Sequence, residues 1–197
     1  RECSVQRRHQ KLVEETPATC LTEAERRRMC ATAVRGLAEL GYRNAGTVEF
    51  LYHDGKMTFN EVNARLQVEH PITEMVTLVD LVRQQILVAA GEEPEVSQGE
   101  IVAHGTAMEC RINAEDPLRN FLPSPGVVTH CQEPAGHGVR VDSGIAAGSN
   151  VPPYYDPLLA KLVVRGRNRH EVVRRMGRAL GDFDIRGVRT TIPFHDA

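Results

Sequence analysis

The sequence lacks the features that mark a membrane protein or a nucleic-acid-binding protein. Its longest apolar runs are broken within a few residues, for example 158–160 by Lys161, whereas a membrane-spanning helix needs about 20 apolar residues. Lys and Arg number 24 and Asp and Glu number 26, so the net charge is -2, although nucleic-acid-binding domains are usually basic. We therefore expect no membrane and no nucleic acid among its partners.

Metal-binding and disulfide patterns are also missing. The 5 cysteines, an odd number, form no CxxC pair, and the 8 histidines show no HxxxH spacing. These absences argue against a zinc site and a disulfide framework. We interpret the cysteines as reduced residues of the core and expect a cytoplasmic location.

The composition itself is that of an ordinary globular protein, with 41% hydrophobic and 25% charged residues in a chain of 197. A polar stretch, 91–99, precedes a series of short strands, which predicts a subdomain boundary within that stretch. Arg1 and the uncovered apolar group 192–194 both resemble cut ends, so we expect the working protein to extend further on both sides.

Local patterns predict an α+β fold. Thr22 and Glu25 form a capping box ahead of apolar residues at helical spacing, which predicts a helix over 22–40. Alternation predicts a strand over 47–52, followed by a return strand from Lys56. The remaining predicted elements are a helix over 78–90, strands over 105–113, 126–132, 138–143 and 158–165, and a helix over 169–183.

The return strand has an unusually polar face. We interpret 57–70 as one strand, whose odd positions are polar from residue 61 onward. This row is either the solvated outer face of an antiparallel sheet or a reaction centre. The polar residues of the row are Glu61, Asn63, Arg65, Gln67 and Glu69.

The second interpretation assigns each polar side chain a chemical role. The oxygen atoms of Glu61, Asn63 and the nearby Glu49 suit a hard cation such as Mg²⁺. Arg65 offers a planar fork for an oxyanion, and Glu69 is a carboxylate that could accept a proton. A metal site, an anion holder and a base together favour phosphate-activated chemistry.

Two further segments allow two interpretations each. Arg111 lies in a predicted strand with polar neighbours, and it makes either an anion contact or a surface salt bridge with Glu109 or Glu115. The basic run 7–11 either holds a phosphate or carbonate group or forms a solvated edge.

The metal interpretation places a condition on the hairpin turn. A two-residue turn at Asp54-Gly55 is the usual pattern, and with regular pairing it would put Glu49 and Glu61 on opposite faces. Two carboxylates on opposite faces cannot bind one cation. We therefore predict a three-residue loop, 53–55, which places both carboxylates on one face.

Several blocks of sequence together resemble the biotin carboxylase family, the ATP-grasp component of biotin-dependent carboxylases. The resemblance runs through the whole chain and rests on the blocks 6–11, 46–51, 61–71, 109–116 and 153–156. It implies an ATP-grasp carboxy-terminal lobe, an antiparallel sheet with helices, over 1–98. It further implies a β-rich biotin carboxylase carboxy-terminal domain, truncated at its end, over 99–197.

The resemblance also implies a reaction. ATP and bicarbonate form carboxyphosphate, whose CO₂ passes to N1 of biotin on a biotin carboxyl carrier protein or domain. The implied cofactors are ATP and Mg²⁺ or Mn²⁺, with biotin as the carried substrate. The further implied partners are a second copy of the chain, in a homodimer, and a carboxyltransferase subunit.

Matching positions imply the roles of individual residues. The metal would be held by Glu49, Glu61 and Asn63, and the nucleotide site would be lined by His9, Glu49, Leu51 and Glu61. The positions that bind bicarbonate are Lys11, Arg65, Gln67 and the backbone of Val68. Arg65 also counts among the catalytic positions; Glu69 would deprotonate bicarbonate, and Arg111 would stabilise the biotin enolate.

The chain departs from the family pattern, because the amino-terminal domain and the lid with its Gly-rich phosphate loop are absent. We therefore expect residues 1–197 alone to be inactive. Pro71 and the turn 123–126 favour an acyl-CoA carboxylase, such as the acetyl-CoA carboxylase of fatty acid biosynthesis, over the pyruvate carboxylase branch. Two different classes also compete with this assignment, a carbamoyl-phosphate synthetase-like ligase and a non-catalytic interaction fragment.

Overall fold

The computed structural model describes residues 1–197, which form two compact units. The first unit consists of 1–17 and 104–197, and the second of 18–103. The expected boundary at 98/99 falls inside the second unit, a few residues before that unit ends at 103. The first seventeen residues nevertheless belong with 104–197, because a strand from that segment pairs with a strand that follows residue 104.

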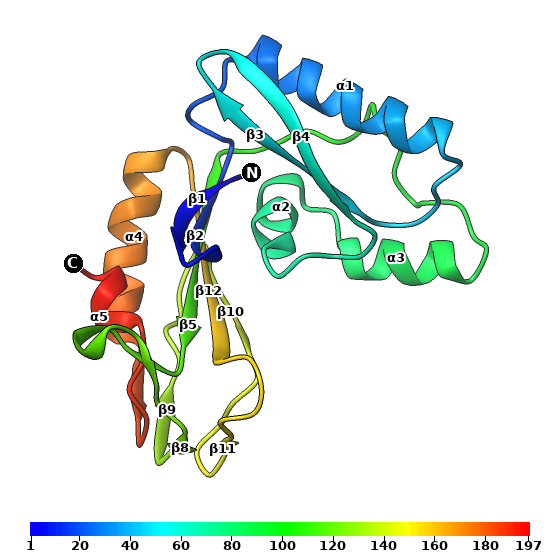
Figure 1. Cartoon of the computed structure of the whole chain (residues 1–197). Coiled ribbons are helices and arrows are strands. Elements are labelled where there is room, and N and C mark those ends of the chain that lie inside the picture. Colours follow the sequence, from blue (N-terminus) through cyan, green and yellow to red (C-terminus); the bar gives the residue numbers. More distant parts are fainter. The chain divides into compact units, whose positions relative to one another are not determined.

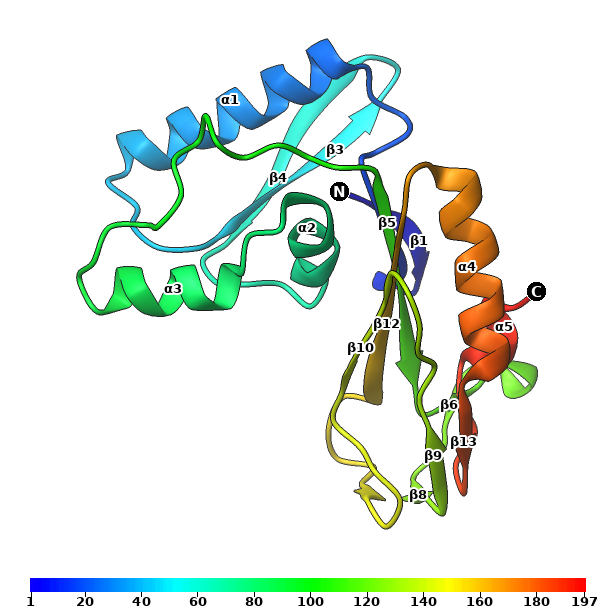
Figure 2. The same cartoon turned by 180° about the vertical axis from the view of Figure 1, so that it is seen from behind.

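The first unit is built on an antiparallel five-stranded sheet in the order β1-β2-β5-β12-β10. Its strands are β1 (Glu2–Arg7), β2 (Gln10–Thr16), β5 (Thr106–Asn113), β12 (Leu158–Gly166) and β10 (Val139–Ser143). Helix α4 (Arg169–Asp182) runs along one face of this sheet, as Figures 1 and 2 show. It buries Val172, Met176 and Leu180 against Cys110 and Leu162 in the main core.

Shorter elements extend the first unit. The strands β6 (Glu115–Asp116) and β7 (Leu122–Pro123), β8 (Gly126–Val127) and β11 (Asn150–Val151), and β9 (His130–Gln132) and β13 (Asp184–Arg186) form three small pairs. A 3₁₀ turn, η1 (Pro117–Arg119), and a short helix, α5 (Ile192–His195), complete the unit. The strand expected over 126–132 is therefore two strands, β8 and β9, which pair with different partners.

The second unit contains the hairpin of β3 (Thr47–His53) and β4 (Lys56–Asn63) and the helices α1 (Glu23–Glu39), α2 (His70–Thr77) and α3 (Leu81–Ala89). Helix α1 runs beside the hairpin in both views. The predicted capping box is confirmed, since the Thr22 hydroxyl accepts from Glu25 N and the Glu25 carboxylate accepts from Thr22 N. Tyr52 Oη donates to Glu25 Oε1 at 2.7 Å and so connects β3 to α1.

The predicted long strand over 57–70 is wrong beyond Asn63. Strand β4 ends there, and a loop leads into α2, which the sequence patterns did not predict. Pro71 lies in the first turn of α2, where its missing N–H costs no helical hydrogen bond. The helix expected over 78–90 begins at Leu81, because the Asp80 side chain caps it by accepting from Arg83 N.

The hairpin of β1 and β2 was also not predicted as such. Its turn consists of Arg8 and His9, both with positive φ, a conformation usually occupied by glycine or asparagine. Arg7 fixes the strand before the turn, donating to Asn120 O at 2.6 Å and stacking over the Phe121 ring at 4.5 Å. None of the helices is both long and apolar enough to cross a membrane.

Candidate functional site

The β3–β4 hairpin turns at two residues. Asp54 and Gly55 have φ of 47° and 75°, and His53 lies opposite Lys56. These values are typical of the common type I′ turn. The predicted three-residue loop is therefore wrong.

A β-bulge within β4 nevertheless brings the two carboxylates together. Phe50 lies opposite Phe59, but the next pair is Glu49 opposite Glu61, which leaves Asn60 as an extra residue on β4. The two phenylalanine rings pack edge to face with centroids 6.4 Å apart. The expectation that both carboxylates share one face is confirmed, although a bulge rather than the turn achieves it.

Four side chains form what we call the carboxylate–amide cluster: Glu49, Glu61, Asn63 and Gln67. Asn63 Nδ2 donates to Glu61 Oε1 at 2.9 Å and to Glu49 Oε1 at 3.4 Å. Gln67 Nε2 also donates to Glu49 Oε1. The amide groups thus bridge two acidic groups that would otherwise repel each other across the hairpin.

The loop after β4 presents the other predicted polar residues in two different environments. Arg65 is exposed, and its guanidinium donates to Asn63 Oδ1 at 3.3 Å and to Leu66 O at 3.0 Å. Gln67 and Glu69 are buried, with Glu69 at the start of α2. The loop therefore combines an accessible cation, which suits anion binding, with a shielded carboxylate, which suits proton transfer.

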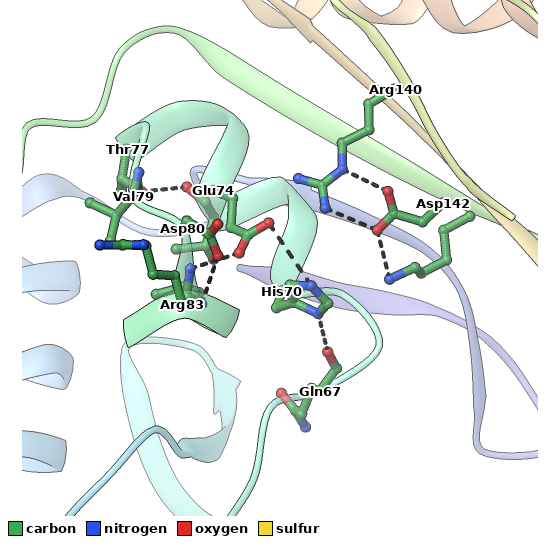
Figure 3. A network of polar contacts seen from close by, with 12 residues as sticks. Gln67, His70, Glu74, Thr77, Val79, Asp80, Arg83, Arg140 and Asp142 are labelled. Atoms are coloured by element: carbon green, nitrogen blue, oxygen red, sulfur yellow. Dashed lines mark hydrogen bonds and ion pairs between the residues drawn. The ribbon is translucent and has the colours of Figure 1, made fainter. Parts of the chain in front are cut away.

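Figure 3 shows how α2 supports this loop. His70 Nδ1 lies 2.9 Å from Gln67 O, and His70 Nε2 lies 3.9 Å from Glu74 Oε2. Glu74 Oε1 accepts from Leu81 N at 2.7 Å, at the start of α3. Sequence reasoning missed His70 and Glu74, because it treated their segment as the end of a strand and the loop before the next helix.

The remaining predicted residues of the second unit, Leu51 and Val68, are close in sequence to members of the carboxylate–amide cluster. Leu51 is in β3 opposite Thr58, with an exposed side chain. Val68 is half-buried in the loop after β4. Neither side chain is polar, so shape and backbone hydrogen bonds are all that these two residues offer to a ligand.

The first unit carries the other predicted residues. His9 is exposed in the β1–β2 turn, and Lys11 is half-buried in β2 opposite Gln6. Arg111 lies in β5, and its Nε donates to Glu14 Oε1 in β2 at 2.7 Å. Arg111 thus forms an ion pair with Glu14, a partner that the sequence did not suggest.

A second ion-pair group lies on two neighbouring strands of the same sheet (Figure 3). Asp142 in β10 accepts from Arg140 Nε at 2.7 Å and lies 3.1 Å from Lys161 Nζ in β12. Burial acts to raise the pKa of Asp142, but the hydrogen bonds from Arg140 and Lys161 outweigh it and lower the pKa. Lys161 in turn lies opposite Arg111 in the sheet.

The donor set of the carboxylate–amide cluster fits a hard cation. Glu49, Glu61 and Asn63 bring carboxylate and amide oxygens to one face, and Mg²⁺ typically takes one or two carboxylates while keeping water and phosphate ligands. No group of three or more His, Cys, Asp or Glu side chains in the structure could hold a metal ion. The cluster therefore suits a cation shared with a phosphate ligand, and does not suit a closed structural site.

Two family models match successive parts of the chain. The carbamoyl-phosphate synthase L chain ATP-binding domain matches residues 1–96, and the biotin carboxylase C-terminal domain matches residues 109–197. Together they account for nearly all of the sequence, in the order that the resemblance implies.

Curated relatives agree with these matches. A pyruvate carboxylase subunit of Methanothermobacter thermautotrophicus is 55% identical over 197 residues, covering 100% of this chain and 40% of that protein. Biotin carboxylase of Haemophilus influenzae is 52% identical over 196 residues, covering 100% of this chain and 44% of that protein. The chain thus spans about two fifths of the length of the relatives it matches.

Solved structures give the same result. The biotin carboxylase domain dimer of the Hydrogenobacter thermophilus 2-oxoglutarate carboxylase, in complex with MgADP, ADP and bicarbonate, superposes with a TM-score of 0.96 at 46% identity. The match covers 98% of this chain and 43% of that one. Sequence, fold and order of domains agree, and the chain is similar over its whole length to biotin carboxylases.

Proposed function

We propose that the protein carboxylates biotin at the expense of ATP and bicarbonate, as the first half-reaction of a biotin-dependent carboxylase. The observation that carries this proposal is the carboxylate–amide cluster, in which Glu49 lies opposite Glu61 and Asn63 bridges them. The Hydrogenobacter thermophilus domain, which shares this fold, was solved with MgADP and bicarbonate. Mg²⁺ or Mn²⁺ in this cluster would neutralise phosphate charge during phosphoryl transfer.

The second unit supplies the groups for phosphate and bicarbonate. The bicarbonate anion would be held by the exposed Arg65, the buried Gln67 and the N–H of Val68. A guanidinium and amide donors match the oxygens of this anion. Glu69 would accept the bicarbonate proton, because its buried carboxylate is shielded from water. Leu51 would pack against the nucleotide.

The first unit contributes three groups to the same reaction. His9 would contact the nucleotide, and Lys11 would add a positive charge for bicarbonate. Arg111, fixed by Glu14 in the sheet, would stabilise the negative charge on the biotin enolate. We propose that residues 1–98 form an ATP-grasp lobe and that residues 99–197 form the biotin carboxylase carboxy-terminal domain.

Our proposals for the partners and for the acceptor of the carboxyl group rest on the similarity to biotin carboxylases. We propose a biotin carboxyl carrier protein or domain, a homodimer and a carboxyltransferase subunit. The dimer named for the Hydrogenobacter thermophilus domain supports the homodimer. An acyl-CoA carboxylase is our proposed branch. The pyruvate carboxylase branch is the second candidate, favoured by the Methanothermobacter thermautotrophicus relative.

The test is a bicarbonate-dependent ATP hydrolysis assay on the full-length protein, with and without free biotin. Wild type should hydrolyse ATP faster when biotin is added, and Glu49→Gln should lose most of this activity because the cation loses one carboxylate. Glu39→Gln, an exposed carboxylate at the end of α1, should match wild type.

Two outcomes separate the proposal from the competing functions. No biotin-stimulated turnover by the full-length protein would contradict the proposal and support an interaction role. Ammonia-stimulated turnover in place of biotin stimulation would favour a carbamoyl-phosphate synthetase-like ligase. Residues 1–197 assayed alone should turn over no ATP.

A further inference from the structure

Glu14 is a charged residue with no exposed surface in the middle of a sheet. Burying an ionised carboxylate is costly unless a cation and hydrogen bonds compensate it. Glu14 lies in β2, directly opposite Glu109 in β5, which is also fully buried. Two opposed carboxylates need a nearby positive charge, and the sheet provides it through Arg111.

The contact between Glu14 and Arg111 is short and made through two guanidinium nitrogens. Arg111 Nε donates to Glu14 Oε1 at 2.7 Å, and Arg111 Nη2 lies 2.5 Å from the same oxygen. The two residues are diagonal neighbours across the β2–β5 pair, although 97 positions separate them in the sequence. Charge-assisted hydrogen bonds of this length hold a side chain in a single orientation.

The two partners differ in exposure. The Glu14 side chain is 0% exposed and the Arg111 side chain is 17% exposed, so an interior carboxylate holds a guanidinium that is partly exposed. The backbone of Arg111 is held as well, because Thr191 Oγ1 donates to its carbonyl oxygen at 2.9 Å and His195 Nε2 lies 2.9 Å from it. Arg111 is thus fixed from both its main chain and its side chain.

We propose that Glu14 is a positioning residue that sets the orientation of the Arg111 guanidinium for the biotin-dependent step. The inference rests on the proposed function and assigns Glu14 a part in it. The guanidinium is a planar fork, so a small rotation moves its hydrogen-bond donors away from the developing enolate oxygen. Misplacement of a reacting group by about 1 Å costs up to about 100-fold in rate.

The same strand offers a matched control. Glu15, the next residue of β2, is also buried and also ion-paired, with Arg169 Nε at 2.8 Å from its Oε2. Its partner belongs to α4, so it faces the other side of the sheet. Glu15→Gln therefore removes the charge of a buried, ion-paired carboxylate of the same strand, whose arginine partner is exposed, without touching Arg111.

The experiment measures ATP hydrolysis by the full-length protein with and without free biotin for Glu14→Gln, Glu14→Asp, Glu15→Gln, Arg111→Lys and the double variant Glu14→Gln/Arg111→Lys. For both Glu14 variants, the ratio of the biotin-dependent rate to the biotin-independent rate should fall about 10- to 100-fold. Glu14→Gln removes the negative charge, and Glu14→Asp shortens the side chain so that it no longer reaches Arg111. Glu15→Gln should keep the wild-type ratio. The double variant should be no worse than Arg111→Lys within about twofold, because Glu14 acts through Arg111.

The outcomes distinguish the inference from the function on which it rests. If wild type shows no biotin-dependent turnover, the proposed function fails and the inference fails with it. If wild type is active and the Glu14 variants keep the ratio of Glu15→Gln, the positioning role alone is overturned. Parallel loss of both rates with a lowered melting temperature would mean a structural role, and additive losses in the double variant would mean that Glu14 acts independently of Arg111.

Discussion

At the scale of single residues, Glu69 carries the most specific prediction. It is buried, it starts α2, and it lies in the loop that also presents Arg65. Glu69→Gln should lower the turnover of the full-length protein by about 10²–10⁴-fold, because a positioned base is lost, while ATP affinity stays nearly unchanged. Steady-state kinetics and calorimetric ATP titration measure the two quantities.

The control for Glu69 is another buried carboxylate of the same helix. Glu74 accepts a hydrogen bond from Leu81 N at the start of α3, so Glu74→Gln should lower the melting temperature and leave turnover close to that of wild type. A Glu69→Gln protein that keeps more than about half of the wild-type rate is incompatible with Glu69 as the base.

Sequence patterns identified most residues of the candidate site but not the element that carries them. Alternation singled out Arg65 and Glu69 as part of a strand, yet they lie in a loop and at a helix start. Their residue types, and the resemblance, were sufficient to select them. Glu14 could not be selected, because its contact with Arg111 depends on which distant strand β2 pairs with.

At the scale of elements, α1 depends on its capping box. The hydrogen bonds from Thr22, followed by the one from Tyr52, hold the pKa of Glu25 at about 2, below its ordinary value of 4.5. Thr22→Ala should lower the melting temperature of the chain by about 2–4 °C at neutral pH. Differential scanning calorimetry measures the shift, and Thr32→Ala in the middle of α1 should not lower it, because alanine favours helix.

The capping box of α1 should also make the stability of the chain depend on pH. A carboxylate with a lowered pKa stabilises the folded state above its ordinary pKa, and this stabilisation is lost as the pH falls toward the folded-state value. The difference between wild type and Thr22→Ala should therefore be largest above pH 4.5 and shrink between pH 4.5 and about 2. A difference that stays constant over this range would mean that Glu25 does not contribute through the cap.

Local sequence patterns correctly predicted the elements that have a clear cap or a regular apolar periodicity. The α1 cap, the main strands β5 and β12, and helix α4 all form within a few residues of their expected bounds. The bulge at Asn60 has no local sequence signal, because the pairing of Glu49 with Glu61 appears only in the register of the hairpin. The turn at Arg8 and His9 was not predicted because its residue types, arginine and histidine, are not those that such a turn favours.

At the scale of the whole molecule, burial is distributed unevenly between the two units. Helices α1 and α3 of the second unit contain no buried residue, whereas β5 is buried along almost its whole length. Amide hydrogen exchange of residues 1–197, followed by mass spectrometry, should be fastest in α1 and α3 and slowest in β5 and β12. Helix α4, which buries its apolar side in the first core, serves as the control and should exchange more slowly than α1.

The order of strands along the chain also has a consequence for synthesis. Strand β2 pairs with β5, and all of the second unit lies between them in the sequence. At about 5–20 residues per second, the ribosome needs roughly 5–20 s to complete the intervening segment, so β2 waits for that time with an unpaired edge. The second unit can fold during this interval, while the exposed edge of β2 remains open to pairing with another chain.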